Sequence, residues 1–315
     1  MIYKVRYTAF LLFISFISFG QVLPTEKSEN HVQIEGTNIF MIPPTEFESS
    51  SNFKGFAKPL DQTSMIMAIE IPGPYAEITK GFDSEGLKAR GMELKSKKSI
   101  KVNKFDGLLI KLDQAANGMI FSKLLLIYGN ETQTTFINGV YLQDNTVLGE
   151  KIKESILTTV IDTNLEINPR EALNYTIDEG VSTLKLHSVM GNAILFNRDL
   201  KTPTESPDKA TLIVDKSFAK MAIQDKKSFC ISRLKEYPEN YNIIENRGIN
   251  DIKIDELKGF ELFAQTSDNA TDEMYQVILF DSDNTYYIFV ANYLASSKET
   301  FKEIQSIIKT FKRKK

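Results

Sequence analysis

The chain has 315 residues, of which 42% are hydrophobic and 25% are charged, and its formal net charge is −3. These proportions are close to those of soluble globular proteins, exclude wholesale disorder and suit about two domains. The mildly acidic balance argues against sequence-independent nucleic-acid binding, which needs many Lys and Arg side chains to neutralise phosphates. The single cysteine, Cys230, cannot form an intrachain disulfide, so stability must come from apolar cores.

The N-terminus has the pattern of a secretory signal peptide. Lys4 and Arg6 precede an apolar run over residues 9–19, and Gly20 follows it. This run of about eleven residues is shorter than a membrane-spanning helix needs, which disfavours the alternative of an uncleaved anchor. We therefore expect residues 1–20 to be removed and the mature chain to be exported, periplasmic or extracellular, without a transmembrane anchor.

Two stretches of 36 residues align without a gap, one beginning at Gly107 and the other at Gly259. Their apolar runs, 124–128 and 276–280, are each followed by a short polar turn and a second apolar run. Strand, tight turn and strand is the pattern of a β-hairpin. A helix with apolar residues at spacings of three and four then closes each copy.

The upstream halves of the two copies correspond more loosely. A first apolar strand is expected at 38–42 in one copy and at 192–196 in the other, and a second at 65–71 and 212–214. A helix follows in each copy, and then a strand leads into the hairpin. Each copy reads β-β-α-β-β-β-β-α, and the short connections favour an antiparallel sheet with helices packed on it.

The sequence therefore predicts an α+β protein with two tandem copies of one domain. The first copy covers residues 31–161 and the second covers 182–312. Residues 162–181 contain Pro169 and Gly180 and have little periodicity, so we expect a linker there, with one extra strand near its C-terminal end.

The segment 38–56, which reads NIFMIPPTEFESSSNFKGF, places paired prolines after a strand, with an aromatic residue close behind. Together with the helix around 87–90 and the late hairpin at 139–141, it resembles the PsbP-like domains. These are α/β/α sandwiches of photosystem extrinsic subunits and many exported bacterial proteins. The second copy departs from the pattern, since Asn197 and Arg198 stand where the prolines would be.

This resemblance implies a non-enzymatic accessory or binding role, with no catalytic residues to carry over. The leader is similar to those of exported proteins from Bacteroidetes-type bacteria, which would place the mature chain in the periplasm or outside the cell.

Motifs for catalysis or cofactor binding are missing from the sequence. His31 and His187 are far apart, and with Cys230 they have no metal-ligand spacing. No Gly-x-Ser-x-Gly elbow, phosphate-binding glycine loop or dinucleotide fingerprint occurs. The acidic turn 281–285 opens like a calcium loop, but Tyr286 stands where such a loop needs glycine, so hairpin turn chemistry explains it. We expect no catalytic residue, no metal site and no cofactor.

Four tyrosines on or beside the second hairpin give a mild positive signal: Tyr275, Tyr286, Tyr287 and Tyr293. Because successive strand residues point to opposite faces, Tyr286 and Tyr287 cannot share one core. One face of this hairpin is a possible aromatic contact surface. The alternative is that these rings lie beneath the helices that cover the sheet.

From these features we expect an exported, non-enzymatic accessory or binding protein of the bacterial envelope. It would act on an envelope protein or a small ligand, through one copy or through the cleft between the copies, because linked modules can create a shared groove. Two alternatives stay open. One is a hydrolase whose active site assembles from residues far apart in the sequence, and the other is a purely structural assembly factor.

Overall fold

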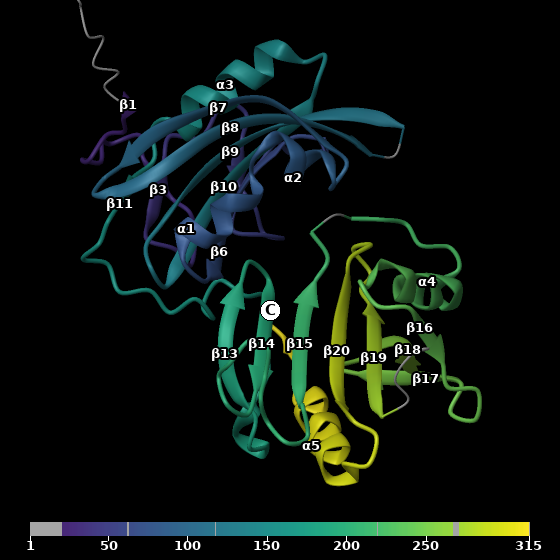
Figure 1. Cartoon of the computed structure of the whole chain (residues 1–315). Coiled ribbons are helices and arrows are strands. Elements are labelled where there is room, and N and C mark those ends of the chain that lie inside the picture. Colours follow the sequence, from purple (N-terminus) through teal and green to yellow (C-terminus); the bar gives the residue numbers. More distant parts are fainter. Residues whose placement is uncertain (1–20, 62, 117, 219, 267–270, 315) are drawn as a thin grey trace, which may run out of the picture.

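The computed structural model describes residues 21–61, 63–116, 118–218, 220–266 and 271–314. The expected signal peptide lies outside these residues. The described chain forms two α+β domains, each built around one large sheet (Figure 1). The expectation of a two-domain α+β fold is therefore confirmed.

The first domain has one large sheet with strand order β1-β7-β8-β9-β10-β6-β5-β4 and a small sheet with order β11-β3-β2. All strand pairs are antiparallel except β1 with β7. The elements are β1 (Gln21–Val22), β2 (Val32–Gln33), β3 (Ile39–Met41), β4 (Glu48–Ser49), β5 (Gly55–Ala57), β6 (Met65–Pro72), α1 (Tyr75–Ile78), a 3-10 turn (Thr79–Gly81), α2 (Ser84–Lys88), β7 (Met92–Val102), β8 (Phe105–Ala116), β9 (Met119–Gly129), β10 (Gln133–Leu142), α3 (Thr146–Ile156) and β11 (Val160–Ile161).

The second domain has one large antiparallel sheet with order β13-β14-β15-β20-β19-β18-β16, in which β17 also pairs with β18. A separate short pair joins β12 to β21. The elements are β12 (Tyr175–Thr176), a 3-10 turn (Glu179–Val181), β13 (Lys185–Met190), β14 (Ala193–Asn197), β15 (Thr211–Lys216), α4 (Lys226–Ser232), a 3-10 turn (Arg233–Glu236), β16 (Tyr241–Ile243), β17 (Ile249–Ile254), β18 (Leu257–Thr266), β19 (Asp272–Phe280), β20 (Tyr286–Leu294), α5 (Lys298–Lys309) and β21 (Lys312–Arg313).

The two large sheets share their central strand order. β7-β8-β9-β10-β6 in the first domain corresponds to β17-β18-β19-β20-β15 in the second. The two repeated hairpins therefore hold the same place in their sheets. β16 and β17 together occupy the position of the single long strand β7, which has a bulge at Lys95.

The gapless alignment of the two hairpins is wrong by one residue in their middle strand. Gly107 pairs with Tyr128, whereas Gly259 pairs with Leu279 and not with Phe280. The turn after β19 explains this shift, because five residues separate the paired residues Phe280 and Tyr286, against four between Gly129 and Thr134. A shift of one residue moves a strand's side chains to the other face, so the correction decides which of them reach each core.

Helices cover both faces of each sheet and give each domain two apolar cores. In the first domain α3 packs on one face through Ile152 and Ile156, and α2 packs on the other through Leu87. In the second domain α5 packs on one face through Ile304, and α4 packs on the other through Cys230. Burial raises the pKa of the Cys230 thiol to about 12, so this cysteine packs as a small apolar side chain.

Asp or Asn residues begin three of these helices. The side chains of Asp83, Asn145 and Asp225 accept hydrogen bonds from the backbone three residues on, at the first turns of α2, α3 and α4. Each satisfies a backbone N–H that would otherwise have no partner within its helix.

The first expected strand of each copy has a different position in the two domains. β14 pairs with β15 within the large sheet, as expected from a repeated domain. Its counterpart β3 instead pairs with β2 and β11 in the small sheet, and β5 occupies the place beside β6. The long segment between β3 and β6 makes this possible, because it supplies a second strand for the same position.

Part of the segment 162–181 belongs to the second domain. Leu173, Tyr175 and Ile177 are buried in the core beneath α5. β12, the extra strand in this segment, pairs with the C-terminal strand β21. Among the described residues, no helix is long and apolar enough to cross a membrane.

Candidate functional site

The two domains meet where β13 approaches β6 and at the turn between β4 and β5. Ser50 closes this turn, since its N–H donates to Gly55 O at 2.9 Å and its Oγ accepts from Asn52 N at 3.1 Å. Asn52 and Phe53, at its tip, reach the second domain. We call residues 51–53 the junction turn.

Asn52 accepts hydrogen bonds from the second domain through two of its oxygens. Its backbone carbonyl accepts a hydrogen bond from Asn192 Nδ2, in the turn between β13 and β14. Its side-chain Oδ1 accepts from Lys216 Nζ, at the end of β15, at 3.3 Å. Beside it, the rings of Phe53 and Phe218 meet edge to face with centroids 6.4 Å apart. One short turn of the first domain thus contacts both a polar and an aromatic part of the second.

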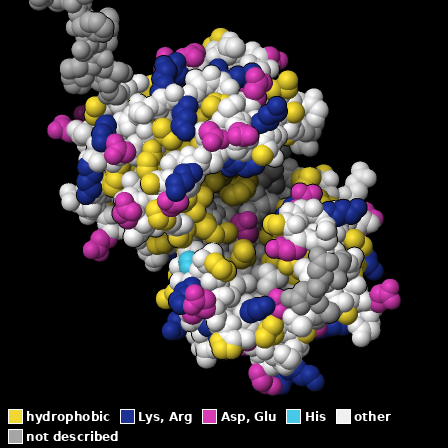
Figure 2. All heavy atoms as spheres, in the orientation of Figure 1, with side chains coloured by type: hydrophobic (Ala, Val, Ile, Leu, Met, Phe, Trp, Pro, Cys, Tyr) yellow, Lys and Arg dark blue, Asp and Glu magenta, His cyan; other side chains and the backbone are white. Residues whose placement is uncertain are grey.

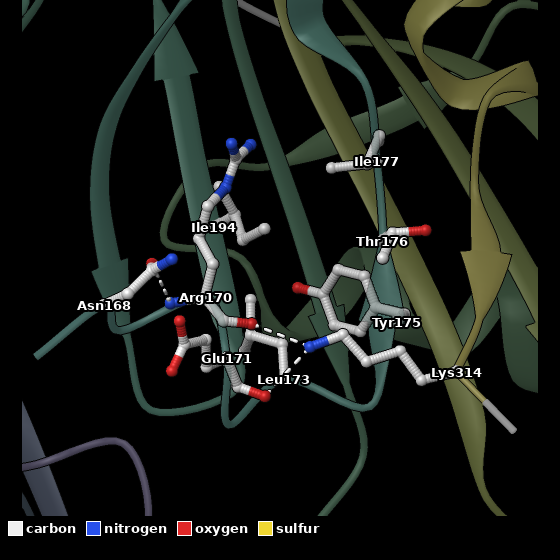
Figure 3. A pocket seen from close by; sticks show the side chains of 9 residues that line it. All are labelled: Asn168, Arg170, Glu171, Leu173, Tyr175, Thr176, Ile177, Ile194 and Lys314. Atoms are coloured by element: carbon white, nitrogen blue, oxygen red, sulfur yellow. Dashed lines mark hydrogen bonds between the residues drawn. The ribbon is translucent and has the colours of Figure 1, made fainter.

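The segment around residues 170–172, which leads into the second domain, packs against both domains. The position of a Cβ on Gly36 would lie 2.2 Å from Ala172 Cβ, so only glycine lets this segment pack against the first domain. On the other side, Lys314 Nζ donates to the carbonyl oxygens of Arg170 and Glu171 at 3.0 and 2.9 Å (Figure 3). The segment is tied to the C-terminal strand as it enters the core.

Two cavities adjoin the junction turn and share Ser51 and Asn52 as a wall. The larger, of about 640 Å³, is lined mainly by charged side chains of the second domain, and we call it the charged cavity. The smaller, of about 340 Å³, is lined by apolar side chains and serine hydroxyls and also by Glu48, Lys58, Asp61 and Lys220, and we call it the apolar cavity. Both volumes fall within the range of roughly 300–1,000 Å³ that is usual for ligand sites.

Arg313 neutralises two carboxylates of the charged cavity. Its Nε donates to Asp255 Oδ2 at 2.9 Å, and its Nη1 contacts both carboxylate oxygens of Asp281 at 3.2 Å. Asp255 and Glu256 form the two-residue turn between β17 and β18, and both have positive φ angles, 46° and 64°. This turn type matches the twist of the strands and sets both acidic side chains at the cavity.

Lys216 forms the inner wall of the charged cavity and is 6% exposed. Burial lowers the pKa of its ammonium group, and the nearby charges of Asp283 and Asp281 oppose that shift. Its Nζ makes a long hydrogen bond to Asn52 Oδ1 and also lies over the face of the Tyr287 ring, 5.8 Å from the ring centroid. A buried cation thus links the two domains.

Phe53, Pro59, Leu60, Met65 and Phe218 supply the apolar cavity with its hydrophobic wall. Leu60 is fully exposed and has a φ angle of 65°, which is unfavourable for a leucine. On the face shown in Figure 2, hydrophobic side chains also gather along both sides of the hollow between the domains. The junction therefore presents apolar area to solvent from both domains.

Asp215, next to Lys216, points to the opposite face of β15 and has a raised pKa. Burial raises this pKa to about 6, although a hydrogen bond from Lys216 N and the charge of Arg233 oppose the shift. The unfolded value is about 3.9, so the folded state binds more protons between about pH 4 and 6, and stability falls as the pH rises through that range.

We expect Asp215→Asn to stabilise the second domain by about 1–3 kcal/mol at pH 7.5 and to have little effect at pH 4, where the native aspartate is protonated. Urea unfolding at both pH values measures this, with the exposed Asp251→Asn on β17 as control. An equal change in stability at the two pH values would contradict the role of burial.

The four tyrosines of the second hairpin divide between the two faces of the sheet. Tyr275, Tyr287 and Tyr293 are at most 2% exposed, and their rings pack in the core beneath α5. Their rings contact Phe301 and Phe311, and Tyr287 also lines the charged cavity. Tyr286 lies on the other face, half-buried against Phe229 of α4.

The two histidines are not brought together. His31 Nε2 lies 2.9 Å from Thr158 O within the first domain, and His187 Nε2 lies 3.2 Å from Thr202 Oγ1 within the second. One local pattern in the sequence could have pointed to a residue of the junction. Leu212, Val214 and Lys216 alternate along β15, which puts a lysine on a core-facing position.

No family model matches the chain, and no curated protein matches it. A crystal structure from Bacteroides thetaiotaomicron VPI-5482 is similar at 14% identity and a TM-score of 0.32 over 47% of this chain, which spans about half (52%) of that structure. LpqN of Mycobacterium tuberculosis, described as involved in cell envelope biogenesis, is similar at 16% identity and a TM-score of 0.31, over 39% of this chain and 82% of LpqN.

The immunity protein TplEi of the type VI secretion system of Pseudomonas aeruginosa is similar at 10% identity and a TM-score of 0.33, over 90% of this chain and 99% of TplEi. At such identities and TM-scores these likenesses say nothing about what this chain binds.

Proposed function

We propose that this chain is an exported, non-enzymatic binding protein of the bacterial envelope, and that its ligand is held at the junction of its two domains. The observation that carries the proposal is the pair of cavities that share the junction turn as a wall. One is charged and one is apolar, and each has walls from both domains.

The construction of the junction supports binding there. A site between domains buries a ligand on several sides without interrupting either core. The side-chain contacts of the junction turn with the second domain are partly polar, as is usual for an interface between domains of one chain. A ligand that touches both domains would add to these contacts.

Two sequence features support the cellular location and the kind of role that we propose. The N-terminal charge and apolar pattern supports export to the periplasm or the cell exterior. The resemblance to PsbP-like domains supports an accessory role, in which each copy is an α/β/α sandwich and the protein acts through an envelope protein or a small ligand.

Photo-crosslinking from the junction turn tests the proposal. Ser51 is exposed and lines both cavities, so it would be replaced by a benzoylphenylalanine residue in the full chain, in cells of the source bacterium. We expect irradiation to add a discrete mass to the chain, from a protein or a small molecule. The matched control carries the probe at Glu299, exposed on α5.

An adduct that forms from Ser51 and not from Glu299 supports a ligand at the junction. The proposal is wrong if Ser51 gives no discrete adduct, or if both positions give the same one.

A further inference from the structure

The two cavities at the junction differ in chemistry and lie on either side of one short turn. Ser51 and Asn52 line both of them, so a ligand that crosses this turn meets the apolar and the charged cavity together. In an extended peptide, successive side chains point to opposite sides of the backbone. Two neighbouring residues of such a peptide can therefore place one side chain on each side of the junction turn.

The apolar cavity suits an aliphatic or aromatic side chain. Phe53 is buried, whereas Phe218 is half-buried and keeps part of its ring accessible. With Pro59 and Met65 these rings form a concave apolar surface from both domains. Pockets of this kind hold the anchoring side chains of peptide ligands.

The solvent side of the charged cavity is acidic. Four carboxylates and three basic groups line it, and Arg313 is already paired with Asp255 and Asp281. Glu256 and Asp283 are exposed, and no described side chain forms an ion pair with either.

Each basic group of this cavity has a partner, and the charges of Lys216 and Lys220 both act on Asp283. Lys216 is buried against Asn52, and Lys314 donates to backbone carbonyls of the linking segment (Figure 3). Lys220 lies at the apolar cavity, where Glu48 and Asp61 match it and Lys58 in number of charges. The accessible carboxylates of Glu256 and Asp283 therefore favour a cationic group on their side of the turn.

We infer that the ligand of the junction is an extended peptide segment of a partner protein in which an apolar residue neighbours a lysine or arginine. The apolar side chain enters beside Phe218, and the cation faces Glu256 and Asp283. This inference rests on the proposed function and specifies the chemistry of the partner.

Three labelled heptapeptides test this chemistry. Each is acetylated and amidated, with glycine and serine around a central pair that is Leu-Lys, Leu-Glu or Ser-Lys. Fluorescence anisotropy with the full mature chain at low ionic strength measures their binding. We expect the Leu-Lys peptide to bind about fivefold more tightly than Leu-Glu, as suits exposed charges. It should bind more than tenfold more tightly than Ser-Lys, as suits an apolar anchor.

Matched variants assign each preference to its cavity. Phe218→Ala should reduce the preference for Leu over Ser and leave the preference for Lys over Glu. The double change Glu256→Gln and Asp283→Asn should do the reverse, and both of its positions are exposed, so the fold is kept. Circular dichroism and thermal melting check the fold of each variant.

Equal binding of the three peptides, tighter binding of Leu-Glu, or no binding at millimolar concentration would overturn the inference. A discrete adduct at Ser51 together with any of these results would leave the proposed function standing and reject only the peptide chemistry.

Discussion

Replacing Gly259 by alanine is expected to lower the unfolding free energy of the second domain by about 3 kcal/mol, because the new methyl group would collide with the neighbouring strand. A Cβ at this position would lie 1.9 Å from Ile278 O and 2.8 Å from its carbonyl carbon. Both strands, β18 and β19, lie inside the sheet and are paired along this stretch, so neither can move aside freely. Urea unfolding followed by circular dichroism and tyrosine fluorescence measures the loss.

Two other glycines provide matched comparisons. Gly107 holds the same place in the first domain, where a Cβ would lie 2.9 Å from Ile127 O, so Gly107→Ala should cost less than Gly259→Ala. At Gly248 a Cβ would meet nothing within 4 Å, but φ is 62°, so alanine there should cost only about 1 kcal/mol of backbone strain. A Gly259→Ala variant no less stable than Gly248→Ala would contradict the close approach of the strands.

The repeated hairpins were predictable because alternation and turn residues are local signals. The runs around 124–128 and 276–280 and the glycines that open the hairpins were enough to predict the same hairpin twice. The register between the copies was not predictable in this way. One additional residue in a polar turn shifts a strand by one position, and the sequence of that turn does not say which strand moves.

The junction could not be read from the sequence for a different reason. Asn52 stands in a serine-rich turn, and Phe218 is an isolated aromatic residue after a strand, so neither belongs to a periodic pattern. Their roles arise only when the two domains meet, which depends on contacts between residues more than 100 positions apart, such as Asn52 with Lys216. Lys216 alone carried a local signal, on the core-facing side of β15.

The tyrosines illustrate the limit of alternation. It correctly placed Tyr286 and Tyr287 on opposite faces of β20. What covers each face is decided by helices distant in sequence, and α5 covers the face that holds Tyr275, Tyr287 and Tyr293. The face to which a strand side chain points is therefore set locally, but whether that side chain is exposed is not.

Phe311→Ala is expected to destabilise the second domain by about 4 kcal/mol, since it removes a large side chain that is 1% exposed. The ring lies between α5 and the sheet, with its centroid 5.7 Å from that of Tyr175, 4.8 Å from that of Tyr287 and 5.2 Å from that of Phe289. Tyr175 comes from β12, so the same ring joins the entering segment, the sheet and the C-terminal helix. Urea unfolding of the full chain measures the loss.

Phe311→Leu is the control, because it keeps most of the apolar volume and should cost much less than alanine. The alanine variant should also loosen β21, which follows directly and holds Arg313 against Asp255 and Asp281. Trypsin should then cleave next to Lys312 faster in the alanine variant than in the leucine variant. If the two variants unfolded at the same urea concentration and were cleaved at the same rate, Phe311 would not be the side chain that joins these three elements.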